Sequence, residues 1–162
     1  MDPATQRGFQ EQVIAPVLDT LSLTEAMLSP LLLGAALGGG FCPWLEQGEG
    51  LGLYRLKEDW HHRLWDDFIA FRPELASRVR GLASQQGFLR APHQELVGNI
   101  PYATAIAVCG LLRHRRYWPE KAVAGAMTRC WLGASGHTRD QWRRYRNAYA
   151  LMLRQRQSLA VA

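Results

Sequence analysis

The stretch HQELVGNIPYATAIAVCGLLR, residues 93–113, decides the fold. Its second half is apolar on nearly every side of a helix, with Ile106, Val108, Leu111 and Leu112 pointing in different directions. A helix that is apolar all round must be covered on every side, so we expect it to be the buried centre of the protein. Pro101 predicts either a kink or a fresh helix start within this stretch.

The sequence on both sides of this stretch also shows helical spacing of its apolar residues. The predicted helices cover residues 5–21, 22–37, 58–70, 73–84, 119–132 and 138–157. Pro16 predicts a bend in the first of them, and capping boxes at Ser22 and Thr138 predict two helix starts. Glycines at 38–40 end the second helix, 85–91 is predicted as a loop, and 41–57 as irregular with at most one short extended piece. The predicted class is all-α, with six or seven helices around one buried helix.

The length of 162 residues fits one domain, 1–162, with loose ends expected at 1–4 and 158–162. Hydrophobic residues make up 48% and charged residues 20%, which is typical of a globular chain. The sequence has three cysteines, and they show no metal-ligand spacing: Cys42, Cys109 and Cys130. This pattern indicates buried thiols in a protein that is made in a reducing cytosol. No signal peptide is expected from residues 1–12, and the longest apolar stretch, about 26–37, is too short to span a membrane.

Charge is divided unevenly along the chain. Residues 1–60 hold three Lys/Arg and eight Asp/Glu, whereas 61–162 hold sixteen Lys/Arg and six Asp/Glu. A basic half favours a polyanion such as nucleic acid, or an anionic wall surface, although it also suits a solubilising face. The candidate polyanion- or partner-binding residues are Arg113, Arg115, Arg116, Arg143 and Arg144. The first three belong to the run RHRRYW at 113–118, which is also typical of a basic helix end.

Several chemical classes have no support in the sequence. His61 and His62 are adjacent, and His93, His114 and His137 are dispersed, so they form no ligand spacing. No HExxH, no glycine-rich phosphate loop and no carboxylate cluster occurs. We therefore expect neither a metal site nor a cofactor.

Five segments together resemble the soluble lytic transglycosylases and related phage lysozyme-like proteins. They are LLLGAALGGGF (31–41), GEGLGLYRL (48–56), LVGNIPYATAIA (96–107), AMTRCWLGASG (126–136) and DQWRRYRNAY (140–149). In that family a helix ends in an E-S-x-F motif, a G-x-x-G-L-x-Q loop follows, and an N-I helix and a closing helix rich in Trp and Tyr come later. No single segment is specific, but their order and spacing match over most of the chain from about residue 5. The resemblance implies a lysozyme-like fold.

The family's catalytic glutamate is missing from this sequence. The resemblance places it at Gly38, and places the motif's serine and glutamine at Gly39 and Arg55. That glutamate is the general acid, a task that glycine has no side chain to perform. Glu49 and Glu46, in the adjoining loop, are the substitutes we consider, although solvated loop carboxylates are poorly aimed. The aromatic residues that neighbour the matched motifs, and so would border a glycan cleft, are Trp44, Tyr54 and Trp131.

Three functions follow as hypotheses. The first is a non-catalytic, virion-associated structural or accessory protein of a bacteriophage, made in the host cytoplasm and serving in particle assembly or cell-wall contact. Its expected partners are other virion proteins and copies of itself, with peptidoglycan and nucleic acid as further candidates. The second is an active peptidoglycan-degrading muramidase or lytic transglycosylase with a displaced carboxylate. The third is a basic nucleic-acid-binding module.

Overall fold

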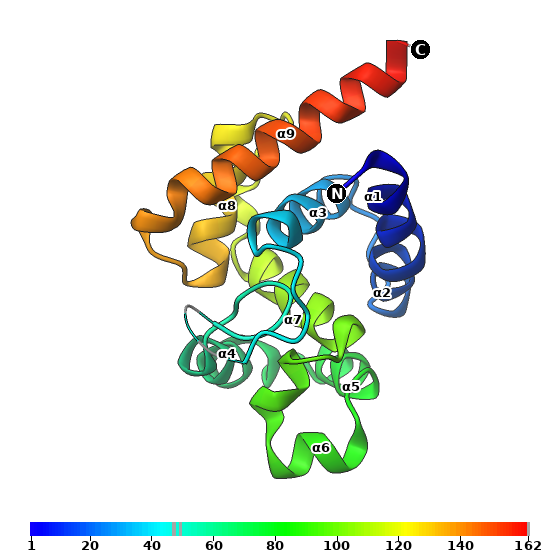
Figure 1. The fold of residues 1–162 in the computed structure, drawn as a ribbon. Helices are drawn as coiled ribbons and strands as arrows, with labels where there is room; N and C mark the ends of the chain where they lie inside the picture. Colours follow the sequence, from blue (N-terminus) through cyan, green and yellow to red (C-terminus); the bar gives the residue numbers. More distant parts are fainter. Residues whose placement is uncertain (47, 49, 162) are drawn as a thin grey trace.

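Helix α7 (Ile100–Arg113) lies in the middle of the structure, as the sequence predicts (Figure 1). The computed structural model describes residues 1–46, 48 and 50–161. Every residue from Tyr102 to Leu111 is buried, and α7 is covered by neighbours on several sides. Asn99 caps α7 by accepting a hydrogen bond from the backbone N–H of Tyr102 at 3.1 Å. Pro101 lies in the first turn, where no N–H is needed, so it marks a fresh helix start.

The other helices surround α7. They are α1 (Pro3–Phe9), α2 (Ala15–Thr20), α3 (Leu28–Gly38), α4 (Glu58–Leu64), α5 (Pro73–Gly81), α6 (Gln85–Arg90), α8 (Ala124–Ser135) and α9 (Trp142–Val161). Short 3₁₀ turns lie at Pro92–Leu96, Arg115–Tyr117 and Arg139–Gln141. The described part of the chain contains no strand, only an isolated antiparallel bridge between Leu51 and Leu56. The predicted all-α class is confirmed.

Helix α9 crosses α3 and α8, and its C-terminal end projects beyond the rest of the molecule (Figure 1). Two glycines of α3 allow the close approach. A Cβ built on Gly34 would collide with the ring of Tyr149, and one built on Gly38 would collide with the ring of Tyr145. Tyr149 also donates a hydrogen bond to the carbonyl of Leu31 at 2.8 Å. The two glycines are four residues apart on α3, and the two tyrosines are four residues apart on α9. Each glycine therefore makes room for one tyrosine ring, and the two contacts lie one helical turn apart.

The N-terminal helical region is interrupted by a π-helical turn, and it begins earlier than expected. Pro3 lies in α1, and Asp2 caps that helix by accepting a hydrogen bond from the N–H of Thr5 at 3.0 Å, although we expected residues 1–4 to be loose. A π-helical turn, Gln10–Ile14, separates α1 from α2. It ends two residues before Pro16, which cannot donate a backbone hydrogen bond, and such turns occur where the regular pattern of helical hydrogen bonds is interrupted.

The prediction that a capping box at Ser22 starts the next helix is wrong. Helix α3 begins only at Leu28, and Ser22 has φ 57°, in the left-handed region. A helix from residue 22 would hold Pro30 in its interior, where the ring collides with the preceding turn. In the observed helix Pro30 falls in the first turn, where proline is tolerated.

Three other helix starts differ from the prediction. Residues 85–91 are mostly helical, because Ser84 caps α6 by accepting a hydrogen bond from the N–H of Gly87 at 3.1 Å. Helix α8 begins at Ala124 rather than Pro119, after an extended Val123. The predicted capping box at Thr138 does not form, since a 3₁₀ turn precedes α9 and Thr138 makes no side-chain cap.

Candidate anion-binding pocket

The position of the missing glutamate is filled by other side chains. Gly38 is buried at the end of α3, under the ring of Tyr145. A Cβ on Gly39 would collide with the carbonyl of Leu53. Arg55, at the place of the family's glutamine, donates a hydrogen bond from Nε to the Gly39 carbonyl at 2.6 Å. The described residues around Gly38 and Gly39 therefore leave no space for the glutamate and serine of the family motif.

The aromatic residues predicted for a glycan site differ in burial. Tyr54 and Trp131 are fully buried, with ring centroids 5.9 Å apart, so neither offers a ring face to a sugar. Their assignment to a glycan surface is corrected to core packing. Trp44 is 72% exposed, with its ring beside Gly98.

Of the two loop acids proposed as substitutes for the glutamate, the structure describes Glu46. Glu46 is exposed and lines a hollow of about 250 Å³ together with Lys57 and Glu58. Glu49, the other proposed substitute, lies outside the described residues.

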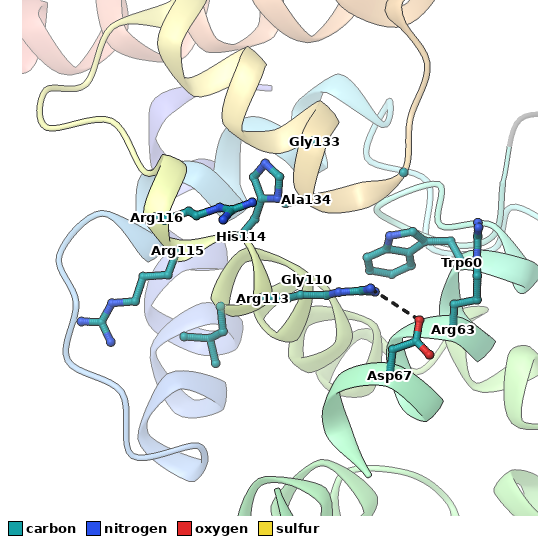
Figure 2. A pocket seen from close by; sticks show the side chains of 12 residues that line it. Trp60, Arg63, Asp67, Gly110, Arg113, His114, Arg115, Arg116, Gly133 and Ala134 are labelled. Atoms are coloured by element: carbon teal, nitrogen blue, oxygen red, sulfur yellow. Dashed lines mark hydrogen bonds and ion pairs between the residues drawn. The ribbon is translucent and has the colours of Figure 1, made fainter. Parts of the chain in front are cut away.

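A larger pocket of about 650 Å³ lies where α4 and the π-helical turn after it, Trp65–Ile69, face α7 and α8 (Figure 2). Its charged lining consists of four arginines, one histidine and one aspartate: Arg63, Arg113, Arg115, Arg116, His114 and Asp67. Three of the arginines, Arg113, Arg115 and Arg116, are among those singled out in the sequence. The fold adds Arg63 from α4, and thus concentrates positive charge in one concave place.

Glycines and one tryptophan shape this pocket. A Cβ on Gly110 of α7 would lie 2.8 Å from both the ring of Trp60 and the carbonyl of Ala134. Gly136 ends α8 with φ 70°, in the left-handed conformation that glycine adopts without strain. The buried ring of Trp60 lies against both glycines and forms part of the wall. The close approach of α7 and α8 is therefore built into the pocket.

The arginines are held loosely rather than neutralised. Arg113 lies 3.5 Å from Asp67, Arg63 lies 3.1 Å from Asp59, and in each pair both side chains are about half exposed or more. Arg115 pairs with Glu25 at 3.1 Å. Exposed pairs of this kind contribute roughly 0–1 kcal/mol, so an incoming anion can compete for the guanidinium groups.

Arg116 differs from the other three arginines. Its guanidinium lies 4.6 Å from the ring centroid of Tyr117, and among the described residues it has no carboxylate partner. His114, beside it, lies with its ring 4.5 Å from that of Tyr117. Burial, and then the charges of Arg116 and Arg113, lower the pKa of His114. A bound anion would offset the repulsion from the two arginines and favour the protonated imidazole.

Arg143 and Arg144, the remaining predicted binding residues, lie exposed on α9 and do not line this pocket. The fold therefore divides the predicted basic set between two places. Arg63 and Trp60 were missed in the sequence, because nothing local indicates that their helix faces the end of α7.

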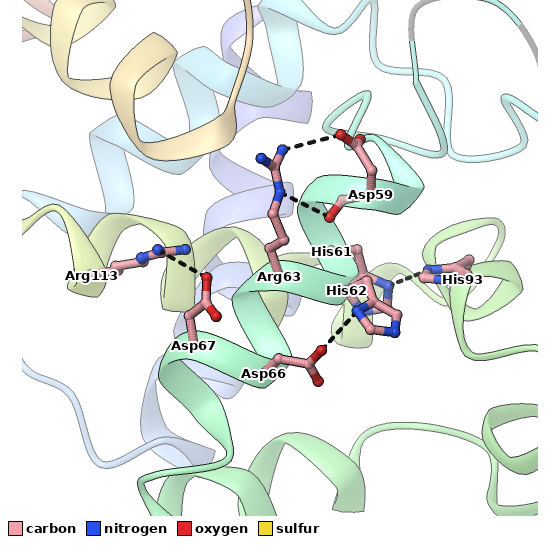
Figure 3. Close-up of polar contacts among 8 residues, drawn as sticks. All are labelled: Asp59, His61, His62, Arg63, Asp66, Asp67, His93 and Arg113. Carbon is pink, nitrogen blue, oxygen red and sulfur yellow. Dashed lines mark hydrogen bonds and ion pairs between the residues drawn. The ribbon is translucent and has the colours of Figure 1, made fainter.

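A second polar cluster joins residues that sequence reasoning left apart (Figure 3). His61 is fully buried, and its Nδ1 lies 2.9 Å from Nδ1 of His93. Its Nε2 lies 2.8 Å from the hydroxyl of Tyr102, while exposed His62 pairs with Asp66 at 2.9 Å. Burial, with the nearby His93 and His62, lowers the pKa of His61 to about 3. A neutral imidazole fits this buried network, which links α4 to the start of α7.

Among the residues that the structure describes, no group of three or more His, Cys, Asp or Glu side chains could hold a metal ion. Within the same residues, no helix is both long and apolar enough to cross a membrane. Comparison with protein-family models, with curated proteins and with solved structures found no match. The resemblance to lysozyme-like proteins therefore stays a prediction, and the geometry of the basic pocket is the best guide to function.

Proposed function

We propose that this chain is a non-catalytic accessory protein that binds the phosphates of a nucleic acid in the pocket between α4, α7 and α8. The observation that carries the proposal is the gathering of Arg63, Arg113, Arg115 and Arg116 around one concave space. Guanidinium groups bind phosphate oxygens through paired, charge-assisted hydrogen bonds. Positive charge focused in a concave site also raises the local concentration of a polyanion.

The proposal of a non-catalytic role is supported by the packing at Gly38. The ring of Tyr145 occupies the space that a side chain at this position would need. The glutamate implied by the resemblance could be restored there only if the ring of Tyr145 were displaced. We infer that the α3–α9 contact has replaced that chemistry with packing.

The resemblance to phage lysozyme-like proteins supports a virion as the place of this role. A particle offers both a nucleic acid and other virion proteins as partners. Mass spectrometry of purified particles tests this part of the proposal, which would be abandoned if the chain were absent from particles of a producing phage.

The binding proposal is tested by fluorescence anisotropy with a labelled single strand and its duplex, and by calorimetry with inorganic tripolyphosphate. For Arg113→Ala/Arg116→Ala we expect affinity to fall about tenfold or more, and the slope of log K against log salt to become about two units shallower.

The matched control is Arg7→Ala/Arg90→Ala, which removes the same charge at two exposed positions on α1 and α6. It should keep most of the affinity, since neither residue lines the pocket. Equal losses in the two double variants, or no salt-dependent binding by the unaltered chain, would contradict the proposal.

A further inference from the structure

A second hollow, of about 720 Å³, is lined by α8, by the segment that follows it and by the start of α9. Its lining is Arg129, Leu132, Gly133, His137, Arg139 and Trp142. Arg129 and Arg139 are exposed, and Trp142, the first residue of α9, is partly exposed. A hollow that is lined by both an indole ring and guanidinium groups offers a stacking surface for an aromatic base and charge for its phosphate.

Gly133 belongs to the lining of both hollows. It is exposed on α8, and a Cβ there would lie 2.5 Å from Nε2 of His114, on the side of the basic pocket. Because Gly133 has no side chain, the imidazole of His114 packs closely against α8 at this point. The two hollows therefore meet at Gly133, beside His114.

The aromatic residues of the basic pocket's own segment are already engaged. Tyr117 stacks with His114 and Arg116, and Trp118 lies under Arg115 and donates its Nε1–H to the Leu111 carbonyl at 2.8 Å. The guanidinium of Arg115 is 5.5 Å from the Trp118 ring centroid. Trp142 has no such ring or guanidinium partner among the described residues, so its exposed face is the one open to stacking.

The wall behind Trp142 is held in place by hydrogen bonds. His137 Nδ1 lies 2.7 Å from the Ser135 hydroxyl, and its Nε2 lies 2.9 Å from the hydroxyl of Tyr145. Ser135 in turn donates to the carbonyl of Trp131 at 2.7 Å. This network ties the end of α8 to the first turns of α9, so the second hollow is fixed by the fold.

We infer that the two hollows form one site for single-stranded nucleic acid, which lays phosphates in the basic pocket, crosses α8 at Gly133, and stacks an unpaired base on Trp142. The inference rests on the proposed function and deepens it. A duplex keeps its bases stacked on one another, so it can use the arginines but cannot place a base on an indole inside a hollow.

Trp142→Leu tests the inference, with an unlabelled tripolyphosphate titration as internal control. We expect the affinity for a 12-nucleotide single strand to fall about tenfold, in line with the loss of one stacked base. The affinity for tripolyphosphate, which occupies the arginines alone, should stay within about twofold, and Trp142→Phe should keep most of the single-strand binding.

Arg129→Ala/Arg139→Ala serves as a second variant, because both residues are exposed and their loss is compatible with folding. It should weaken the single strand and leave tripolyphosphate unchanged. The inference is overturned if Trp142→Leu and this double variant both bind the single strand as the unaltered chain does, or if they weaken duplex and single strand alike. Failure of the proposed function looks different, because Arg113→Ala/Arg116→Ala would then leave every ligand unaffected.

Discussion

The ring of Tyr145 on α9 lies so close to Gly38 on α3 that a Cβ at position 38 would overlap it. Both residues are buried, and the neighbouring pair of Gly34 and Tyr149 repeats the contact one helical turn away. Gly38, which stands where the resemblance places a catalytic glutamate, is therefore also the residue that allows α9 to pack closely against α3.

Gly38→Ala should destabilise the protein by about 1–3 kcal/mol, because the added methyl group must displace the Tyr145 ring in a close-packed core. Urea unfolding followed by circular dichroism measures the change. Gly8→Ala is the matched control, as it lies in α1 and a Cβ there meets nothing within 4 Å. That variant should be neutral or slightly stabilising, because alanine favours a helix over glycine. Similar stability changes for both variants would show that the Tyr145 contact is not tight.

Purified peptidoglycan should release no muropeptides when it is incubated with micromolar protein beside an active lysozyme. The expectation follows from the packed surroundings of Gly38 and from the exposure of Glu46. Clear release by the unaltered chain would contradict it. In that case the variants Glu46→Gln and Glu49→Gln are tested in the same assay. The variant that no longer releases muropeptides identifies the carboxylate that acts as the acid.

Asp67→Asn should strengthen the binding of tripolyphosphate by about two- to fivefold at low salt. Asp67 is the only acid in the lining of the basic pocket as described, and it lies 3.5 Å from Arg113. Its removal frees that guanidinium from an exposed pair worth roughly 0–1 kcal/mol. Asp66→Asn removes the same charge from the neighbouring residue, which pairs with His62 instead. If both variants gain the same affinity for tripolyphosphate, the gain comes from the overall charge of the protein and not from the Asp67–Arg113 pair.

Lowering the pH from about 6.5 should destabilise the fold through His61. Its pKa is about 3 in the folded protein, against an ordinary value of 6.5. The unfolded chain therefore takes up the proton first, and the stability present above pH 6.5 is lost as pH falls toward 3, by about 1 kcal/mol for each pH unit. His114, whose pKa is also lowered, acts in the same direction.

His61→Gln separates the two histidines in this measurement. Its free energy of unfolding should depend less on pH between 6.5 and 5 than that of the unaltered chain, whatever its absolute stability. This window lies above the region in which the carboxyl groups titrate. The Glu95 carboxyl also titrates below this window. Burial raises its pKa, but the hydrogen bonds from Ser84 and Asn99 outweigh burial and lower that pKa below its ordinary value. An unchanged pH dependence would mean that His61 accepts a proton within the fold.

The sequence was sufficient to predict the central helix, because apolar residues lie on every side of that helix and none of its faces suits contact with water. It was insufficient where a helix start depends on a distant contact. Ser84 caps α6, for example, while its N–H and hydroxyl are both engaged by Glu95. The capping box at Ser22 was outweighed by Pro30, which permits a helix only from Leu28 onward.

The candidate site was predicted in part for the same reason. Arg113, Arg115 and Arg116 are close in sequence, so their density was visible, whereas Arg63 joins them only because α4 lies beside the end of α7. That glycine stands where the resemblance places a glutamate was visible too. That Tyr145 fills the space was not, because more than a hundred residues separate the two. Tyr54 and Trp131 were misplaced because an aromatic residue near a motif serves a core and a binding surface equally well.

The walls of the basic pocket come from three separated parts of the chain, 60–67, 110–116 and 133–136. No fragment of the protein carries the whole site, so a ligand of this pocket recognises the folded chain and not the unfolded one. Any anion that occupies it must raise the melting temperature, by an amount that grows with the logarithm of its concentration divided by its Kd. A thermal-shift screen of phosphorylated compounds can therefore rank natural ligands directly, by how far each one raises that temperature.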